Sequence, residues 1–364
     1  MKLRIWMMSA AIIATATITT HSFGEEPAEA APNPVQFSGF VDGYYAWNSN
    51  DPDSHENFDP GTGTTAKRSD EFALNLASIE VSREAKPLGF KLSLVAGNGT
   101  EIVHAGEPQG AGTGPDTYEN IYEAWISYKP TEKLMIKGGV FPSHIGFEGF
   151  YSKDNWNYTR SWLGEFSPYY QAGVHAGYQF TDHWSGEVHV LNGWQIIGDN
   201  NDSKAIGGKI AYSGERLNAS LSTFNGPELA DNDDDWRHFG NILVLWKATP
   251  RLSVGGSLDR GHQECPDSAA ADWTGIAGYA RYTLNDRSAI ALRAEQFDDP
   301  DNGISGTAQK LREATLTFEY RPVDRLILKL EARHDSSTEP VFQEEDDSFS
   351  KTETLIILGA VATF

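Results

Sequence analysis

Apolar and polar residues alternate with a period of two along most of the chain from residue 35 onward. Between residues 326 and 335, for example, Leu328 and Leu330 alternate with Lys329 and Glu331. Successive side chains of a β-strand point to opposite faces, so this period is typical of strands with one apolar and one polar face. The pattern therefore predicts a protein built from two-faced strands.

A recurring motif separates these strands: an aromatic residue, a short polar turn and the start of the next strand. The aromatic positions are spaced by 34, 34, 36 and 38 residues and are occupied by Tyr178, Tyr212, Trp246, Tyr282 and Tyr320. Longer segments rich in Gly, Asp, Asn and Pro lie between the motifs and are typical of loops. Short and long connections therefore alternate, and the repeating unit is a pair of strands.

This alternation predicts an all-β fold, a transmembrane antiparallel up-and-down β-barrel of about 16 strands. Strands of this length suit a tilted crossing of a hydrocarbon layer, which takes about 9–11 residues. Aromatic residues beside the tight turns suit the headgroup level, so we expect tight periplasmic turns and long outer loops. The expected strands are 35–47, 69–83, 88–96, 119–129, 134–141, 170–180, 184–192, 204–212, 216–225, 237–247, 251–260, 273–283, 287–297, 310–321, 325–335 and 352–364.

Two expected strands fit the period poorly. The alternation slips within 69–83, and within 237–247 the polar Asn241 shares a face with Leu243 and Leu245. A secreted β-propeller or β-helix also has repeated strands and turns. The regular alternation of long and short loops favours the barrel, because a propeller has no need of it.

The N-terminal residues have the pattern of a targeting segment. Lys2 and Arg4 precede an apolar run at 5–18, and the small residues Ser22 and Gly24 suit a signal peptidase. We therefore expect export to the outer membrane of a Gram-negative-type bacterium after cleavage of this segment. The predicted organisation is a signal peptide at 1–24, a disordered lead-in at 25–34 and the barrel at 35–364.

The composition argues against nucleic acid as a partner and against sites that need several cysteines. The formal net charge of -22 argues against nucleic acid as a partner, because binding to phosphates requires basic residues. Cys265 is the single cysteine, so the chain has no intramolecular disulfide and no Cys-rich metal site. The sequence assigns no role to this thiol.

Several segments carry a resemblance to a known family: FSGFVDGYY at 37–45, AWISYKP at 124–130, KGGVFPSHIGFE at 137–148, NWNYTRS at 155–161 and PYYQAGV at 168–174. On these segments the chain resembles the beta-barrel porin-2 family, the OmpL-like porins, and the block 137–174 is the most specific part. The resemblance implies an outer-membrane channel. It leaves open the solute and whether the channel is a homo-oligomer.

No motif for catalysis is present, since the chain lacks Gly-x-Ser-x-Gly, His-Glu-x-x-His and Gly-x-x-x-x-Gly-Lys. We therefore expect no catalytic residues, no enzyme activity and no cofactor. His144, His175 and His189 could line the interior, with Glu187 near His189. Solvated histidines are favoured over a metal site there. The acidic clusters of the long loops are interpreted as solvated, with divalent bridging to lipid headgroups as the alternative.

The alternation also predicts which charged residues face the interior, and they carry both signs. The inward set is Asp42, Lys91, Glu123, Lys137, Glu187, Arg293, Glu295, Glu319, Arg321, Lys329, Glu331 and Arg333. Opposed acidic and basic walls suit the passage of small polar solutes. The residues predicted to line the pore are Lys137, Glu187, Arg293, Glu295, Arg321, Lys329 and Arg333.

The longest loop, 142–169, is unusually rich in aromatic residues, so we expect it to pack against the inner wall rather than extend into water. Packing at the outer rim or at a subunit contact is the alternative. If the loop folds inward, it makes a charged constriction in which Glu148, Asp154 and Glu165 face a basic wall and Arg160 pins the loop. The expected wall residues are Arg293, Arg321 and Arg333.

The predicted function is that of an outer-membrane porin, a water-filled channel for passive diffusion of small polar or ionic solutes. Its expected partners are outer-membrane lipid, lipopolysaccharide and those solutes. The alternative is a barrel that acts as a surface ligand-binding protein or as a hydrolase.

Overall fold

The computed structural model describes residues 33–58, 63–266, 268–346 and 348–364. The predicted signal peptide, residues 1–24, lies outside this part of the chain, as do all but the last two residues of the predicted lead-in. Residues 35–364 form the compact unit described below.

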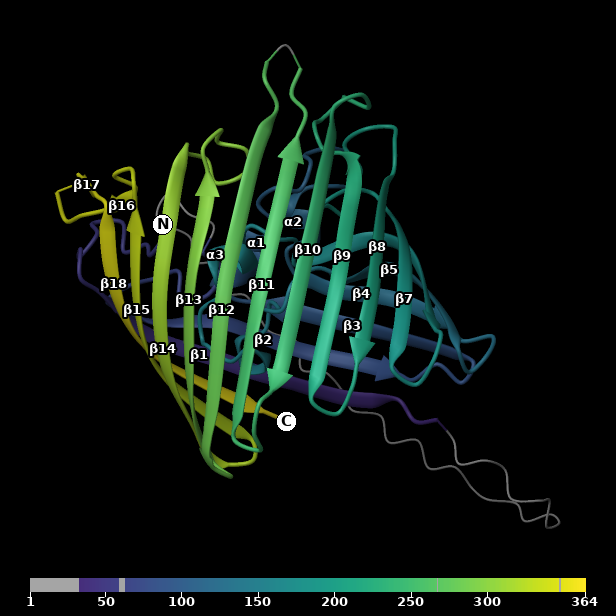
Figure 1. Ribbon diagram of the computed structural model, residues 1–364, viewed down its shortest axis with the longest axis horizontal. Coiled ribbons are helices and arrows are strands. Elements are labelled where there is room, and N and C mark those ends of the chain that lie inside the picture. The colour runs from purple at the N-terminus through teal and green to yellow at the C-terminus, as the bar shows by residue number, and fades with distance from the viewer. Residues whose placement is uncertain (1–32, 59–62, 267, 347) are drawn as a thin grey trace, which may run out of the picture. The chain divides into compact units, whose positions relative to one another are not determined.

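In the described part of the chain, sixteen strands close into one antiparallel barrel, in which strands adjacent in the sequence pair with each other (Figure 1). The predicted number, direction and order are confirmed, and every strand end lies within three residues of its expected position. The barrel strands are β1 (Gln36–Asn48), β2 (Phe72–Arg83), β3 (Leu88–Ala96), β4 (Ile121–Tyr128), β5 (Leu134–Pro142), β6 (Tyr170–Gln179), β7 (Trp184–Leu191), β8 (Ala205–Ser213), β9 (Leu217–Pro227), β10 (Trp236–Lys247), β11 (Leu252–Gln263), β12 (Ala271–Asn285), β13 (Ser288–Asp299), β14 (Gln309–Val323), β15 (Leu326–Ser337) and β18 (Thr352–Thr363).

The remaining elements belong to the long connections. They are α1 (Asn98–His104), α2 (Pro115–Tyr118), η1 (Ser152–Asp154), α3 (Trp162–Glu165), and the short strands β16 (Phe342–Gln343) and β17 (Phe349–Ser350), which pair with each other. None of the helices in the described ranges has the length and apolar character that a membrane crossing requires.

The barrel closes where β1 pairs with both β2 and β18. The amide of Gly39 donates to the carbonyl of Phe364 at 3.2 Å, and the amide of Phe364 donates to the carbonyl of Gly39 at 3.0 Å. A Cβ on Gly39 would lie 2.4 Å from the carbonyl oxygen of Ser78, so no larger residue fits at this junction without a shift. The two strands at the ends of the sheet therefore complete a wall without a free edge.

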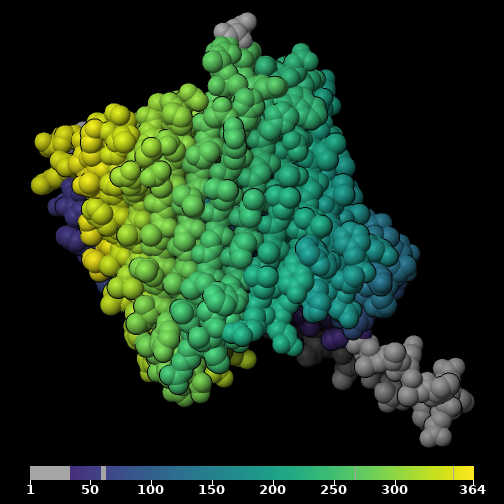
Figure 2. All heavy atoms as spheres, viewed as in Figure 1, coloured from purple at the N-terminus to yellow at the C-terminus, as the bar shows by residue number. Residues whose placement is uncertain are grey.

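The two faces of the strands meet the environments that the alternation predicts. On β15 the side chain of Leu330 is 51% exposed on the outside, whereas its neighbours Lys329 and Glu331 are buried on the inside. Figure 2 shows the outer surface that the central strands form together. Backbone groups in this wall bond to adjacent strands, as a bilayer requires.

The weak alternation of β2 has a structural cause. Asp42 of β1 pairs with Leu76 and the next residue, Gly43, pairs with Leu74, so Asn75 is an additional residue in β2. Such a β-bulge exchanges the faces of the residues on its two sides. In β10 the inward residue Asn241 is followed by Leu243 and Leu245 on the same face, because Ile242 and Val244 are exposed outside.

Prediction: Leu330→Lys should destabilise the folded barrel in lipid by about 2–4 kcal/mol, since a charge near the bilayer midplane loses its hydration. Ser253→Lys, which places the same charge on the inner face of β11, should have a much smaller effect. Equilibrium unfolding of both variants in urea, in lipid vesicles, measures the difference. Equal losses of stability would show that the two faces are assigned incorrectly.

Candidate functional site

The connection between β5 and β6, residues 143–169, lies inside the barrel, and we call it the inner loop. Its residues Tyr158, Arg160 and Trp162 are almost completely buried. The short helix α3 in this loop packs against β12 and β13, and Figure 1 shows it behind these strands. The loop therefore covers the inner faces of the C-terminal half of the barrel, as expected from its aromatic content.

Carboxylates of the wall bind amides of the inner loop. Glu331 on β15 accepts hydrogen bonds from the backbone amides of Tyr158 at 2.6 Å and Thr159 at 2.9 Å. Glu295 on β13 accepts from the amides of Trp162 and Leu163 at the start of α3. A buried amide without an acceptor costs free energy, so these carboxylates stabilise the inward position of the loop.

Cations of the same wall bind carbonyls of the loop. The ammonium group of Lys329 donates to the carbonyl oxygens of Ser152 at 2.8 Å and Asn155 at 2.7 Å, and also to that of Asn157. The guanidinium of Arg333 donates to the carbonyl of Arg160 at 2.6 Å. Acidic side chains of the wall thus bind amides of the loop, and basic side chains of the same wall bind its carbonyls.

Glu148 meets the basic wall as predicted. Its carboxylate lies 2.7 Å from the guanidinium of Arg293, which also donates to the carbonyl of Thr159 at 2.7 Å. The second partner of Arg293 is Glu313, at 2.6 Å, which the sequence analysis missed. Glu313 could have been found, because it precedes Thr315 on the inward face of β14.

The prediction that Asp154 faces the basic wall is wrong, and Glu165 forms its ion pair with Arg160 rather than with a residue of that wall. Asp154 pairs with its neighbour Lys153 at 2.7 Å, and its side chain is 62% exposed. Glu165 pairs with Arg160 at 3.3 Å, while the charge of Arg333 in the basic wall also acts on its carboxylate. Burial raises the pKa of Glu165 above its usual range, and the charge of Arg160 opposes that shift.

Arg160, which was predicted to pin the inner loop, contacts a second connection inside the barrel. Its guanidinium lies 3.5 Å from the centre of the Tyr169 ring and donates to the hydroxyl of Thr64 at 3.1 Å. Thr64 belongs to the connection between β1 and β2, so Arg160 joins two long connections inside the barrel.

The predicted pore-lining residues divide into two groups. Arg293, Glu295, Lys329 and Arg333 are buried beneath the inner loop. Lys137, Glu187 and Arg321 are partly exposed, and they lie toward the tight turns. Four of the seven predicted lining residues therefore hold the loop, which covers the wall on which they lie.

The part of the interior near the tight turns, which we call the inner chamber, is open to solvent. On β7, Leu191 and His189 near the long loops are buried, whereas Glu187 and Ser185 toward the turn are partly exposed. A cavity of about 370 Å³ at the turn end of β5, β6 and β7 is lined in part by Lys137, His175 and Glu187. Charged residues on the inner faces of the strands in this region include Glu80, Lys91, Glu123, Lys137, Glu187, Lys209, Arg281, Glu319 and Arg321.

His144, His175 and His189, which were predicted to line the interior, form one stack. The ring centre of His189 lies 4.1 Å from that of His144 and 4.7 Å from that of His175. Glu187 adjoins the stack, with an oxygen 3.0 Å from Nε2 of His189. Imidazole and carboxylate groups are ligands for transition metals, so this is a group that could hold an ion.

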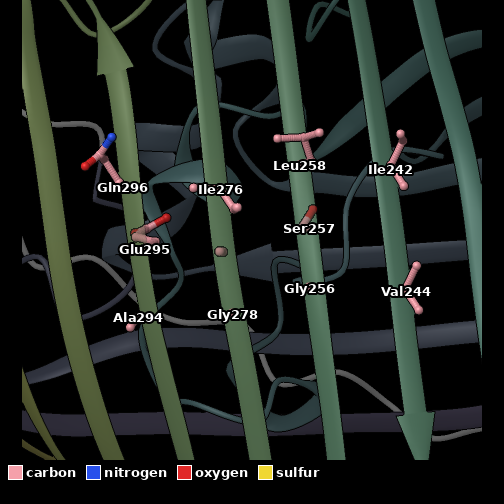
Figure 3. Close-up of a pocket in the computed structure, with 11 residues that line it drawn as sticks. Ile242, Val244, Gly256, Ser257, Leu258, Ile276, Gly278, Ala294, Glu295 and Gln296 are labelled. Atoms are coloured by element: carbon pink, nitrogen blue, oxygen red, sulfur yellow. The ribbon is translucent and has the colours of Figure 1, made fainter.

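A groove of about 690 Å³ crosses the outer face of β10, β11, β12 and β13. Figure 3 shows Ile242, Leu258 and Ile276 beside the glycine positions Gly256 and Gly278, which pair with each other across two strands. These apolar residues are exposed on the outer face, so the groove belongs to the membrane-facing side of the wall and not to the channel.

Comparison with known proteins agrees with this architecture. A family model described as "Putative beta-barrel porin-2, OmpL-like" matches residues 34–364. No curated protein matches the chain.

The fold is shared with many solved structures, of which three are described. The outer membrane channel DcaP of Acinetobacter baumannii has a TM-score of 0.61 at 14% identity, over 91% of this chain and 97% of its own. The anion-selective porin from Comamonas acidovorans has a TM-score of 0.59 at 12% identity, over 91% and 99%. The trimer form of OmpT from Vibrio cholerae has a TM-score of 0.57 at 10% identity, also over 91% and 99%.

Prediction: Glu331→Gln should weaken the attachment of the inner loop, because it replaces a charged acceptor of two backbone amides. Hydrogen bonds to charged groups contribute about 1.5–3 kcal/mol each, so a loss of about 2 kcal/mol in the free energy of unfolding is expected. Hydrogen exchange at residues 155–163 should become faster.

Asp154→Asn is the matched control for this experiment, because it removes an exposed charge of the same loop. Its exchange should stay close to that of the wild type. Unchanged exchange in Glu331→Gln would mean that wall carboxylates do not hold the loop.

Proposed function

Because the chain belongs to the beta-barrel porin-2 family of OmpL-like porins and is an outer-membrane channel, we propose that it favours small anions. Solutes cross by passive diffusion, and the passage is narrowest beside the inner loop. Glu148 and Arg160 position the loop there, together with the wall residues beneath it. This mechanism includes no catalytic step.

The proposal is supported by two lysines of the inner chamber that form no ion pair with a described carboxylate. Among the described residues, neither Lys137 nor Lys209 has a carboxylate within 4.0 Å. The ammonium group of Lys137 lies 4.2 Å from the centre of the Trp125 ring instead. Positive charges without a bound counter-ion of their own attract anions into a confined space.

Most other charges of the inner chamber are paired. Lys91 contacts Glu80 at 3.3 Å and Glu123 at 2.6 Å. Arg281 and Arg321 share Glu319, each at 3.0 Å. The five basic and four acidic side chains named for the inner chamber sum to +1, although the whole chain is strongly acidic. The anion-selective porin from Comamonas acidovorans shares this fold, which supports the proposal.

We also propose where the protein is located and how it assembles. The segment 1–24 directs export and is removed, the apolar outer face contacts outer-membrane lipid and the acidic long loops lie beside lipopolysaccharide outside the cell. Several copies associate in the membrane. The occurrence of a trimer form in OmpT, which has the same fold, supports this part of the proposal.

Prediction: replacing both Lys137 and Lys209 by Gln should lower the ratio of anion to cation permeability. A unit charge about 7 Å away attracts an anion and repels a cation by about 0.6 kcal/mol each in water, so each lysine should change the ratio by roughly sevenfold before screening by salt. Reversal potentials in planar bilayers under a KCl gradient measure the ratio.

The matched control replaces Lys86 and Lys310, which lie outside the inner chamber and form ion pairs with Glu84 and Asp298. Their double variant changes the net charge equally and should leave the ratio unchanged. The same shift in both double variants would show that total charge, rather than the chamber, sets selectivity.

Prediction: a membrane-impermeant maleimide should label Cys265 on intact cells. This thiol is partly exposed in the long connection between β11 and β12, which the proposal places outside. In a Cys265→Ser background, Asp286→Cys in the tight turn between β12 and β13 should react only after the outer membrane is permeabilised. The opposite result would invert the topology.

A further inference from the structure

Three metal-binding side chains meet on the inner faces of β6 and β7. His175 of β6 pairs directly with His189 of β7 in the strand register. Glu187 precedes His189 by two residues and therefore lies on the same inner face. One nitrogen of each histidine and a carboxylate oxygen of Glu187 all lie within 4.8 Å of one another.

The two histidines have nitrogen atoms that the fold does not use. His189 is only 2% exposed, and its Nδ1 has no hydrogen-bond partner among the described residues. Nδ1 of His175 is also buried without a partner in this part of the chain. A buried polar atom without a partner is unfavourable, so each Nδ1 is available to bind a ligand.

An ion can reach the group from the inner chamber. His175 and Glu187 line the cavity of about 370 Å³, which also leaves room for water beside the group. His144 is not available as a ligand, because Nδ1 contacts the side-chain oxygen of Gln171 at 2.8 Å and Nε2 contacts the carbonyl of Thr223 at 3.0 Å. Its stacked ring instead supports the ring of His189 from the other side.

We propose that His175, Glu187 and His189 form a binding site for a divalent transition metal ion of the zinc class. Two imidazole nitrogens, one carboxylate oxygen and one water match the donors and the coordination number that Zn²⁺ prefers. Ligand atoms around a tetrahedral zinc ion are about 3.4 Å apart, so rotation of the two stacked rings has to shorten the longest separation by at most about 1.4 Å. Softer thiolate-binding and harder oxygen-binding ions are disfavoured by the same donor set.

Two neighbouring lysines set the strength of the site. In the strand register Lys209 of β8 lies opposite Glu187, and Lys137 of β5 lies opposite His175. Their positive charges repel a divalent cation, so affinity should be lower than in a closed structural zinc site. This repulsion provides a test, because removing Lys209 should tighten metal binding while it weakens the proposed preference for anions.

The experiment is calorimetric titration of the folded full-length barrel in detergent with Zn²⁺, and separately with Co²⁺, whose visible absorption reports its ligands. We expect one site per chain in the wild type. His175→Ala or His189→Ala should weaken binding by roughly tenfold or more, and Glu187→Gln should also weaken it. Lys209→Gln should strengthen binding severalfold. Neither readout depends on conductance, so the result is independent of the proposed solute preference.

His183→Ala is the control, since His183 lies in an exposed tight turn and is not part of the group of possible metal ligands found among the described residues. Heat-modifiable migration on gels verifies that each variant folds. Zinc binding that is unchanged in the folded His175→Ala/His189→Ala double variant, or that is lost in His183→Ala, would overturn the site. Absence of saturable binding in the wild type would overturn it as well.

Discussion

The inner wall of the barrel binds the backbone of the inner loop, and the layout of the interior depends on this interaction. Glu331 and Glu295 accept from loop amides, while Lys329 and Arg333 donate to loop carbonyls. Buried charges are stable only when each has partners of opposite polarity, and a peptide backbone supplies both polarities at short intervals. The charges of this wall therefore bind the loop, and the loop separates them from passing solutes.

The asymmetry of the interior follows from that arrangement. Strands β12 to β15 are covered along most of their inner faces, so the charges that solutes encounter come mainly from β3 to β8 and from the turn end of the barrel. Lys137 and Lys209 lie on this uncovered side, where the inner loop brings no carboxylate of its own. The position of one loop thus selects which wall determines the electrostatics of the channel.

The strands were predictable from the sequence because a period of two is a direct consequence of backbone geometry. The bulge at Asn75 appeared as a slip in that period, and the ion pair of Glu148 with Arg293 followed from an inward loop facing an inward basic residue. Period two carries no information inside a loop, so the partners of Asp154 and Glu165 were not predictable. Bonds from side chains to loop amides leave no pattern in residue type.

In the histidine group, one contact was predictable from the sequence and the other was not. Gln179 pairs with Ser185 across the tight turn, and counting four residues away from the turn on each strand brings His175 opposite His189. The tight turn therefore fixes the register of β6 against β7. Counting residues from this turn would have predicted the pair of histidines from the sequence. The contact with His144 was not accessible in this way, because that residue comes from the inner loop.

The barrel wall is complete only when β1 pairs with β18. Until those two strands meet, each presents a row of unsatisfied amides and carbonyls, which hydrocarbon cannot solvate. The hydrogen bonds between β1 and β18 join the most distant parts of the chain and carry the largest entropic cost of loop closure. A defect in β1 or in β18 should therefore not loosen the barrel locally, but prevent its entry into the membrane as a whole.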